Sequence, residues 1–166
     1  DTHILESDAF YFNSNLTQEE YQLNEWNGKD EKNIKFNVNN YLDNVQITEQ
    51  DIKYNIEVQI TNSDAQLVDL KIQDENGNNI SAETETGSEN TILKVSDLIL
   101  KYDTTAEQLL KTNNYNIIIT PQNDKIEEGK IINVTLKITS TEPYIKELTS
   151  NIKLTVHTVA NYVGNL

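Results

Sequence analysis

Strict alternation of apolar and polar residues is the clearest pattern in this chain, and it recurs in short segments. Within residues 51–61 every second position is apolar: Ile52, Tyr54, Ile56, Val58 and Ile60. Residues 33–39 repeat the pattern with Ile34, Phe36 and Val38. Because successive side chains of a β-strand point to opposite faces, each segment predicts a strand with one face in a core and the other in water.

Other short segments rich in strand-forming residues are separated by polar and turn-forming stretches. Strands are expected over residues 8–12, 91–95, 115–120, 130–139 and 150–158. Residues 68–73 and 80–85 flank Asn76-Gly77, a pair typical of tight hairpin turns, and this arrangement predicts a β-hairpin. A short helix is expected over residues 105–112, where Ala106, Leu109 and Leu110 would share one face.

These elements predict an all-β fold. We expect an antiparallel β-sandwich, jelly-roll or immunoglobulin-like, with roughly seven to nine strands and one short helix. The chain shows no internal repeat and no linker, so residues 1–166 are expected to form a single β-sandwich domain.

The charge balance narrows the classes of partner. The chain has 27 acidic residues and 13 basic ones, all of them lysine, and a net charge of −14. This charge repels nucleic-acid phosphates and anionic lipid headgroups, so neither is expected as a partner. No apolar run approaches the roughly 20 residues that cross a bilayer, and no membrane insertion is expected. The absence of methionine from a chain that begins at Asp1 is expected to reflect removal of an export leader, which predicts a secreted protein.

No group of residues has the spacing of a catalytic, metal or cofactor site. His3 and His157 lie at opposite ends of the chain, without the spacing of a zinc site. One acidic segment resembles the start of a calcium loop, with the ligand-type residues Asp74, Asn76, Asn78 and Glu83. A turn followed by the return strand of a hairpin is the favoured interpretation of that segment. The sequence therefore predicts a protein that is not an enzyme and that binds no cofactor or metal.

The order of several short segments resembles that of small exported proteins of Firmicutes. These segments are Phe10-Tyr11-Phe12, residues 34–41, Ile47-Thr48, Ile52-Lys53-Tyr54 and residues 140–148. They are similar to the TasA/camelysin group, β-sandwich subunits that a dedicated signal peptidase releases and that assemble into matrix fibres. Members of that group have also been labelled metallopeptidases, and this chain lacks any zinc-ligand pattern. The resemblance implies a fibre subunit on the surface of a Gram-positive type bacterium.

Two functional hypotheses follow. In the first, the protein is a structural subunit of an extracellular fibre or a cell-surface or biofilm matrix assembly, and its partner is another copy of itself, joined head to tail. Residues 1–7 would be a donor arm for strand exchange anchored by Ile4 and Leu5, whereas residues 8–12 would form the first strand of their own domain. In the alternative, a monomeric adhesin or ligand-binding sandwich uses loops around Trp26 or residues 97–103. Trp26 itself is expected to cap the core.

Overall fold

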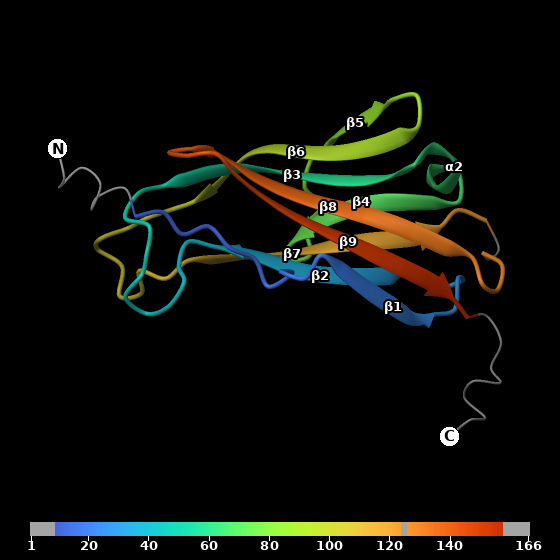
Figure 1. The fold of residues 1–166 in the computed structure, drawn as a ribbon, viewed down its shortest axis with the longest axis horizontal. Helices are drawn as coiled ribbons and strands as arrows, with labels where there is room; N and C mark the ends of the chain where they lie inside the picture. The colour runs from blue at the N-terminus through green and yellow to red at the C-terminus, as the bar shows by residue number, and fades with distance from the viewer. Residues whose placement is uncertain (1–8, 124–125, 158–166) are drawn as a thin grey trace, which may run out of the picture.

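The fold is a sandwich of two β-sheets, seen in a computed structural model that describes residues 9–123 and 126–157. One sheet has six strands in the order β1-β9-β8-β3-β6-β5, and the other has three in the order β2-β7-β4 (Figure 1). The elements are β1 Glu20–Trp26, β2 Lys32–Asn39, β3 Ile52–Thr61, α2 Asn62–Ala65, β4 Val68–Asp74, β5 Glu83–Thr86, β6 Asn90–Leu100, β7 Thr112–Pro121, β8 Ile131–Glu142 and β9 Lys146–Val156. The predicted all-β sandwich is thus confirmed.

Strand β3 lies in the middle of the six-stranded sheet and supplies much of the core. It pairs antiparallel with β6 on one side and with β8 on the other. Its five alternating apolar side chains, from Ile52 to Ile60, are each no more than 2% exposed. Because both edges of β3 are paired and one face is fully buried, the strict alternation in its sequence was a sufficient signal.

The three-stranded sheet covers the inner face of the larger sheet. Strand β7 is its centre, pairing antiparallel with β2 and with β4. Ile117 and Ile119 of β7 point into the core beside Ile34 and Phe36 of β2. All these side chains belong to the one buried cluster that joins the two sheets.

Strand β1 was not predicted from the sequence, and its pairing is parallel. It lies at the edge of the six-stranded sheet against β9, with Tyr21 opposite Ile152 and Leu23 opposite Leu154. The register shifts between Leu23 and Trp26. The other paired strands run antiparallel. Trp26 is 3% exposed, which confirms that it caps the core.

The helix predicted over residues 105–112 is wrong. Residues 101–111 form an irregular loop, and β7 begins at Thr112. The Asp103 carboxylate accepts hydrogen bonds from the backbone N (2.9 Å) and the hydroxyl (2.7 Å) of Thr105, which closes a local turn. Ala106 and Leu109 stay partly exposed, so a helix there would have no core to pack on, and a short helix without tertiary packing is unstable. The one short helix of the described residues is α2, capped by the Thr61 side chain.

The predicted hairpin is correct in its turn and wrong in its strand pairing. The chain reverses at Asn76-Gly77, and Ile80 N donates to Ile72 O (2.9 Å). Beyond that point the chain leaves β4, and the next strand, β5, pairs with β6 in the other sheet. All four residues of β5 are exposed threonines or glutamates, so no apolar face holds this segment against β4.

Residues 9–12 belong to the domain, as expected for residues 8–12, but not as a regular strand. Phe12 is completely buried, and Asn13 forms an isolated antiparallel bridge with Asn39 of β2. Tyr11 exchanges two hydrogen bonds with Thr48, from its N to the hydroxyl (2.6 Å) and from the hydroxyl to its O (2.9 Å). Residue 8 and the arm of residues 1–7 lie outside the described residues.

The described chain begins at one end of the sandwich and finishes at the other (Figure 1). At the first end Phe10 packs edge-on against Tyr144 in the β8–β9 turn, with ring centroids 5.6 Å apart. At the second end His157 N donates to Trp26 O (2.8 Å). We call these the leading end and the trailing end. Strand β3 runs from the leading end at Ile52 to the trailing end at Thr61, where α2 follows.

Candidate assembly interface

The six-stranded sheet is wider than the sheet that covers it, and this leaves a groove beside β4. The groove has a volume of about 210 Å³ and lies between β4 and the inner face of β3, β5 and β6. Its lining is mostly apolar, with polar residues at the rim: Ile60, Ala65, Val68, Asp69, Leu70, Thr84, Thr91, Leu93 and Gln122. Ala65, Leu70 and Leu93 are only partly buried against the core. These three side chains therefore leave apolar surface open in the groove.

The outer edge of β4 is only partly paired. Its second half is covered by the turn that follows it, since Asp74 N donates to Asn78 O (2.9 Å) and Ile72 O accepts from Ile80. Along a strand of an antiparallel pair, the backbone N–H and C=O groups of alternate residues point toward the same neighbour. The backbone groups of Leu70 therefore point away from β7, as those of Ile72 and Asp74 do, and lie at the groove. At the near end the Gln122 side chain donates to Val68 O (3.0 Å). The edge around Leu70 is therefore the open part of β4.

This groove lies at the trailing end. Ile60 lies one residue before the end of β3 and Ala65 is the last residue of α2, both at the end of the sandwich opposite Ala9. The chain therefore continues toward residues 1–8 at one end and presents an open apolar seam at the other.

The opposite edge of the sandwich has a second groove. It has a volume of about 240 Å³ between β1 and β2, and its apolar lining comes from Leu16, Tyr21, Leu23, Ile34 and Ile152. Half of the β2 edge beside it is already covered. Asn15 N donates to Asn37 Oδ1 (3.1 Å), and Asn37 N donates to Asn15 Oδ1 (2.8 Å). The chain itself thus closes part of this seam.

Exposed apolar side chains collect at the leading end. Of the six large hydrophobic residues that are exposed in the described part of the chain, five lie there: Leu42, Val45, Ile99, Tyr144 and Ile145. The first two lie in the connection between β2 and β3, and the last two in the β8–β9 turn. Ile99 pairs with Lys53, which in turn pairs with Glu142 at the end of β8. Among the described residues, the leading end therefore exposes more large apolar side chains than the trailing end.

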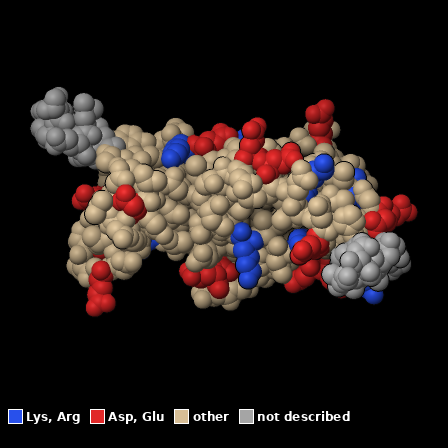
Figure 2. Space-filling view, turned by 60° about the horizontal axis from the view of Figure 1, so that its bottom comes forward, with Lys and Arg blue, Asp and Glu red and all other residues tan. Residues whose placement is uncertain are grey.

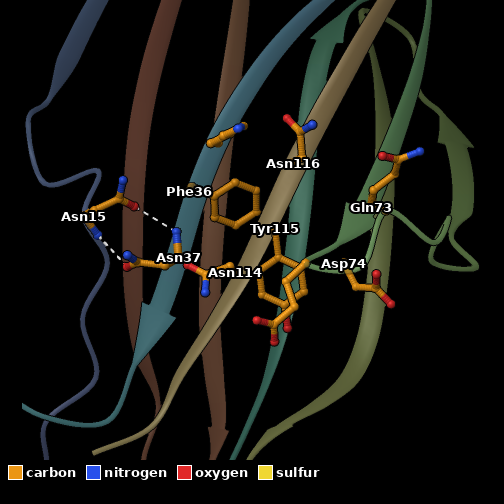
Figure 3. Close-up of a pocket in the computed structure, with 11 residues that line it drawn as sticks. Asn15, Phe36, Asn37, Gln73, Asp74, Asn114, Tyr115 and Asn116 are labelled. Atoms are coloured by element: carbon orange, nitrogen blue, oxygen red, sulfur yellow. Dashed lines mark hydrogen bonds between the residues drawn. The ribbon is translucent and has the colours of Figure 1, made fainter.

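A third feature is a polar hollow on the outer face of the three-stranded sheet. It measures about 390 Å³ and is lined largely by carboxamides, among them Asn15, Asn37, Gln73, Asn114 and Asn116 (Figure 3). Phe36 and Tyr115, which also line it, are buried and present little ring surface. The hollow thus offers hydrogen-bonding groups without an exposed aromatic platform.

Charge is spread over the surface instead of being gathered in one site. Figure 2 shows acidic side chains scattered around the visible face, mostly toward its margins, with fewer lysines among them. The backbone N–H of Tyr102 and the Lys101 amine hold the pKa of Asp51 below its usual range. Hydrogen bonds from Thr105 lower the pKa of Asp103 in the same way. Both carboxylates are surface groups, so neither shift points to a catalytic site.

The residues considered for chemistry from the sequence are not brought together. The carboxylate of Asp74 accepts from the backbone N of Asn76 (2.9 Å) and of Asn78 (3.0 Å), which fixes the turn, and Glu83 lies apart in β5. His157 Nδ1 lies 3.2 Å from Glu128. Among residues 9–123 and 126–157, no three or more potential metal ligands form a group. His3, Ile4 and Leu5 lie outside this part of the chain.

In the alternative hypothesis, the loops around Trp26 would have to bind a ligand without the Trp26 ring. The indole is buried, and its N–H donates to Asp30 O (2.7 Å), so the ring cannot serve as a surface platform. The groove beside β4 was missed, because its lining comes from β3, α2, β4, β5 and β6. No local pattern in the sequence could have predicted a groove whose lining comes from so many separate elements.

No family model and no curated protein sequence matches the chain. Among solved structures, a PapD-like domain of human CEP192 aligns with 91% of this chain and 87% of its own, at 9% identity and a TM-score of 0.45. The major pilin subunit of Bacillus cereus aligns with 89% of this chain, which spans 40% of that protein, at 15% identity and a TM-score of 0.45. The CooA pilin subunit of enterotoxigenic Escherichia coli aligns with 88% of this chain and 98% of its own, at 10% identity and a TM-score of 0.42. These values establish neither a family nor a function.

In the described part of the chain, no helix has the length and apolar character needed to cross a bilayer.

Proposed function

We propose that this protein is a structural subunit of an extracellular bacterial fibre or a cell-surface or biofilm matrix assembly, and that its copies join head to tail by N-terminal strand exchange. The observation that carries this proposal is the groove beside β4, which opens at the trailing end. The chain reaches its donor residues Ile4 and Leu5 from Ala9, at the leading end. Donor and acceptor at opposite ends make a heterologous contact, and such a contact propagates into a filament.

The physical basis is β-augmentation, in which an extended segment adds a strand to an exposed sheet edge. Each main-chain hydrogen bond to the β4 edge contributes about 0.5–1.5 kcal/mol. Each apolar side chain buried against Leu70 and Leu93 contributes about 1.5–3 kcal/mol. Association costs at least about 4 kcal/mol, so a donor with two apolar anchors gives a weak joint when it acts alone. The exposed apolar residues of the leading end would add to it when the end of one subunit meets the next.

A complementation experiment tests the proposal. One variant lacks residues 1–7 and keeps the groove, and the other carries Leu70→Asp in the groove and keeps the arm. Each alone is expected to stay monomeric by sedimentation velocity, whereas the unmodified protein forms filaments visible by negative-stain microscopy. An equimolar mixture of the two variants is expected to form dimers and nothing longer, because only one arm and one groove remain compatible.

Asn133→Asp is the matched control for Leu70→Asp, because it adds the same charge at an exposed position of β8 and should leave polymerisation unchanged. Ile4→Asp with Leu5→Asp should behave like the deletion. The proposal is wrong if the deletion variant still forms filaments. It is also wrong if both variants are folded by circular dichroism and their mixture stays monomeric.

A second candidate function is a monomeric cell-surface adhesin or ligand-binding module, and the carboxamide-lined hollow favours it. The exposed amide group of Asn114, together with the carboxamides around it, could bind a polyhydroxylated ligand. In that case the unmodified protein would remain monomeric under all conditions, and Asn114→Ala would weaken binding to a glycan array without affecting the fold.

The proposal also includes a secreted, non-enzymatic role with no bound cofactor or metal. It fits a surface whose acidic groups are dispersed, and the Asp74 carboxylate in the carboxamide-lined hollow is already bonded to the backbone of its own turn.

A further inference from the structure

Two Asn–Gly steps occur in the sequence, Asn27-Gly28 and Asn76-Gly77. In such a step the backbone nitrogen of glycine can attack the side-chain carbonyl carbon of asparagine, because glycine carries no side chain to obstruct the approach. The reaction requires the asparagine side chain to rotate toward the next nitrogen and the intervening backbone to adjust. The surroundings of each step therefore decide whether it reacts in the folded protein.

Asn27 is held in place by three hydrogen bonds. Its Nδ2 donates to Asp30 Oδ2 (2.8 Å), and its Oδ1 accepts from the backbone N of Lys29 (2.9 Å) and of Asp30 (2.9 Å). Gly28 is buried below it. A Cβ added to Gly28 would lie 2.6 Å from a methyl group of Val156. Neither the side chain nor the backbone of this step has room to rotate.

Asn76 has the opposite surroundings. Residues 75–79 are all exposed, and the Asn76 side chain forms no hydrogen bond with the described residues. A Cβ added to Gly77 would meet nothing within 4 Å. Among the described residues, the one hydrogen bond of the attacking atom runs from Gly77 N to Asp74 O (3.0 Å), and it lies on the surface.

From this contrast we propose that Asn76 is a site of spontaneous deamidation in the folded protein and that Asn27 is protected. Gly77 N forms a bond to Asn76 Cγ, the Cγ–Nδ2 bond breaks, and the side-chain nitrogen leaves as ammonia with the proton lost from Gly77 N. One water molecule then opens the resulting succinimide at either carbonyl. The products are aspartate or isoaspartate at position 76.

Either product changes the rim of the carboxamide-lined hollow, which Asp74, Glu75 and Gly77 help to form. A new carboxylate appears beside two existing ones. Isoaspartate also adds a methylene group to the main chain, which displaces the backbone N–H of Asn78 from its bond to Asp74 Oδ1. The age of a protein molecule would therefore alter the charge and the shape of this turn.

Peptide mapping by mass spectrometry after incubation at mildly alkaline pH tests the proposal. In the folded protein Asn76 is expected to convert at least about tenfold faster than Asn27, since Asn27 must first break three hydrogen bonds. In urea the two steps should convert at similar rates, because both have a glycine next to the asparagine and no folded surroundings. Asp30→Ala should raise the rate at Asn27 and leave Asn76 unchanged, while Glu31→Ala should change neither.

The proposal is overturned if Asn27 converts as fast as Asn76 in the folded protein. It is equally overturned if Asn76 stays intact under conditions in which the urea-treated protein reacts. An Asn27 rate that does not rise in Asp30→Ala would contradict the cause assigned to its protection.

Discussion

A buried pair of tyrosines links the two sheets and gives the sharpest stability prediction. Tyr54 of β3 and Tyr115 of β7 come from different sheets, and their hydroxyl groups share a hydrogen bond across the core. Tyr54 is completely buried. Its oxygen also accepts from Asn113 Nδ2 (2.8 Å), whose amide group donates to Ile99 O as well (3.0 Å). The Tyr54 hydroxyl is therefore the centre of the network, with a partner on either side.

Because of this arrangement the two hydroxyls are not equivalent. Tyr54→Phe leaves both the Tyr115 hydroxyl and one N–H of Asn113 without that partner, and a buried unsatisfied group costs about 1–3 kcal/mol. Tyr115→Phe leaves Tyr54 still bonded to Asn113, so its cost should be that of one hydrogen bond, about 0.5–1.5 kcal/mol. The double variant should lose less than the sum of the two, because both changes remove the same bond.

Urea unfolding followed by the fluorescence of the single tryptophan, Trp26, measures these differences. The midpoint should fall most for Tyr54→Phe, with an unchanged dependence on urea. Tyr102→Phe serves as the control, since its hydroxyl forms no hydrogen bond with the described residues. A Tyr54→Phe protein as stable as the unmodified one, or less affected than Tyr115→Phe, would refute the assigned geometry.

The same pair predicts sensitivity to alkali. Burial raises the pKa of Tyr54 far above its usual range, with a further contribution from Tyr115, and burial also raises the pKa of Tyr115. In the unfolded chain both lose their protons near pH 10. Their contribution to stability is therefore fully present below about pH 10 and is lost as the pH rises above it. When the urea midpoint is measured at increasing pH from neutrality, it should fall less steeply in the variant with both Tyr54→Phe and Tyr115→Phe than in the unmodified protein.

Four further predictions follow. Gly28→Ala should destabilise the fold strongly, whereas Gly77→Ala should destabilise it only by about 1 kcal/mol, as thermal melts of the two variants would show. Both glycines have a positive φ, but only at Gly28 do backbone and side-chain atoms occupy the place of an added Cβ. Asp51→Asn should cost less than about 1 kcal/mol, because the carboxylate is partly exposed. Because the pKa of Asp51 is lower in the folded than in the unfolded protein, its charged carboxylate stabilises the fold above about pH 4. This contribution is lost as the pH falls further, so the urea midpoints of the unmodified protein and of Asp51→Asn should converge in acid. Self-association should rise with salt, as the Debye length shortens from about 30 Å at 0.01 M to about 8 Å at 0.15 M, and sedimentation profiles that do not change would argue against a polymer of this acidic chain. Purified protein should cleave neither protein nor glycoside substrates, with or without zinc, and a metal-dependent cleavage of a protein substrate that is lost in His3→Ala or His157→Ala would contradict this.

The sequence predicts a strand well where the strand's own residues determine its burial, and poorly where its position depends on distant segments. Strand β3 has a full apolar face and paired edges, so its own pattern was enough. Strand β1 has Tyr21 and Leu23 in alternation, but the register shift before Trp26 interrupts the pattern. It lies at an edge, where half-buried residues give a weak signal, and its partner β9 is at the far end of the chain. A parallel pairing between such distant segments is not joined by a tight turn, so no turn motif in the sequence indicates it.

The segment after β4 shows the same limit beside the groove on which the proposed assembly depends. Asn76-Gly77 forms the turn that its residue types favour, so the local chemistry was interpreted correctly. Which sheet receives β5 depends on β6, whose Leu93 pairs with Thr84 and faces the groove. Because β5 carries only threonine and glutamate, it has no apolar side chains that would pack it beside β4. Since β5 pairs with β6 instead, the edge of β4 around Leu70 stays open. The feature that most supports assembly therefore arises from a pairing that a short-range pattern cannot specify.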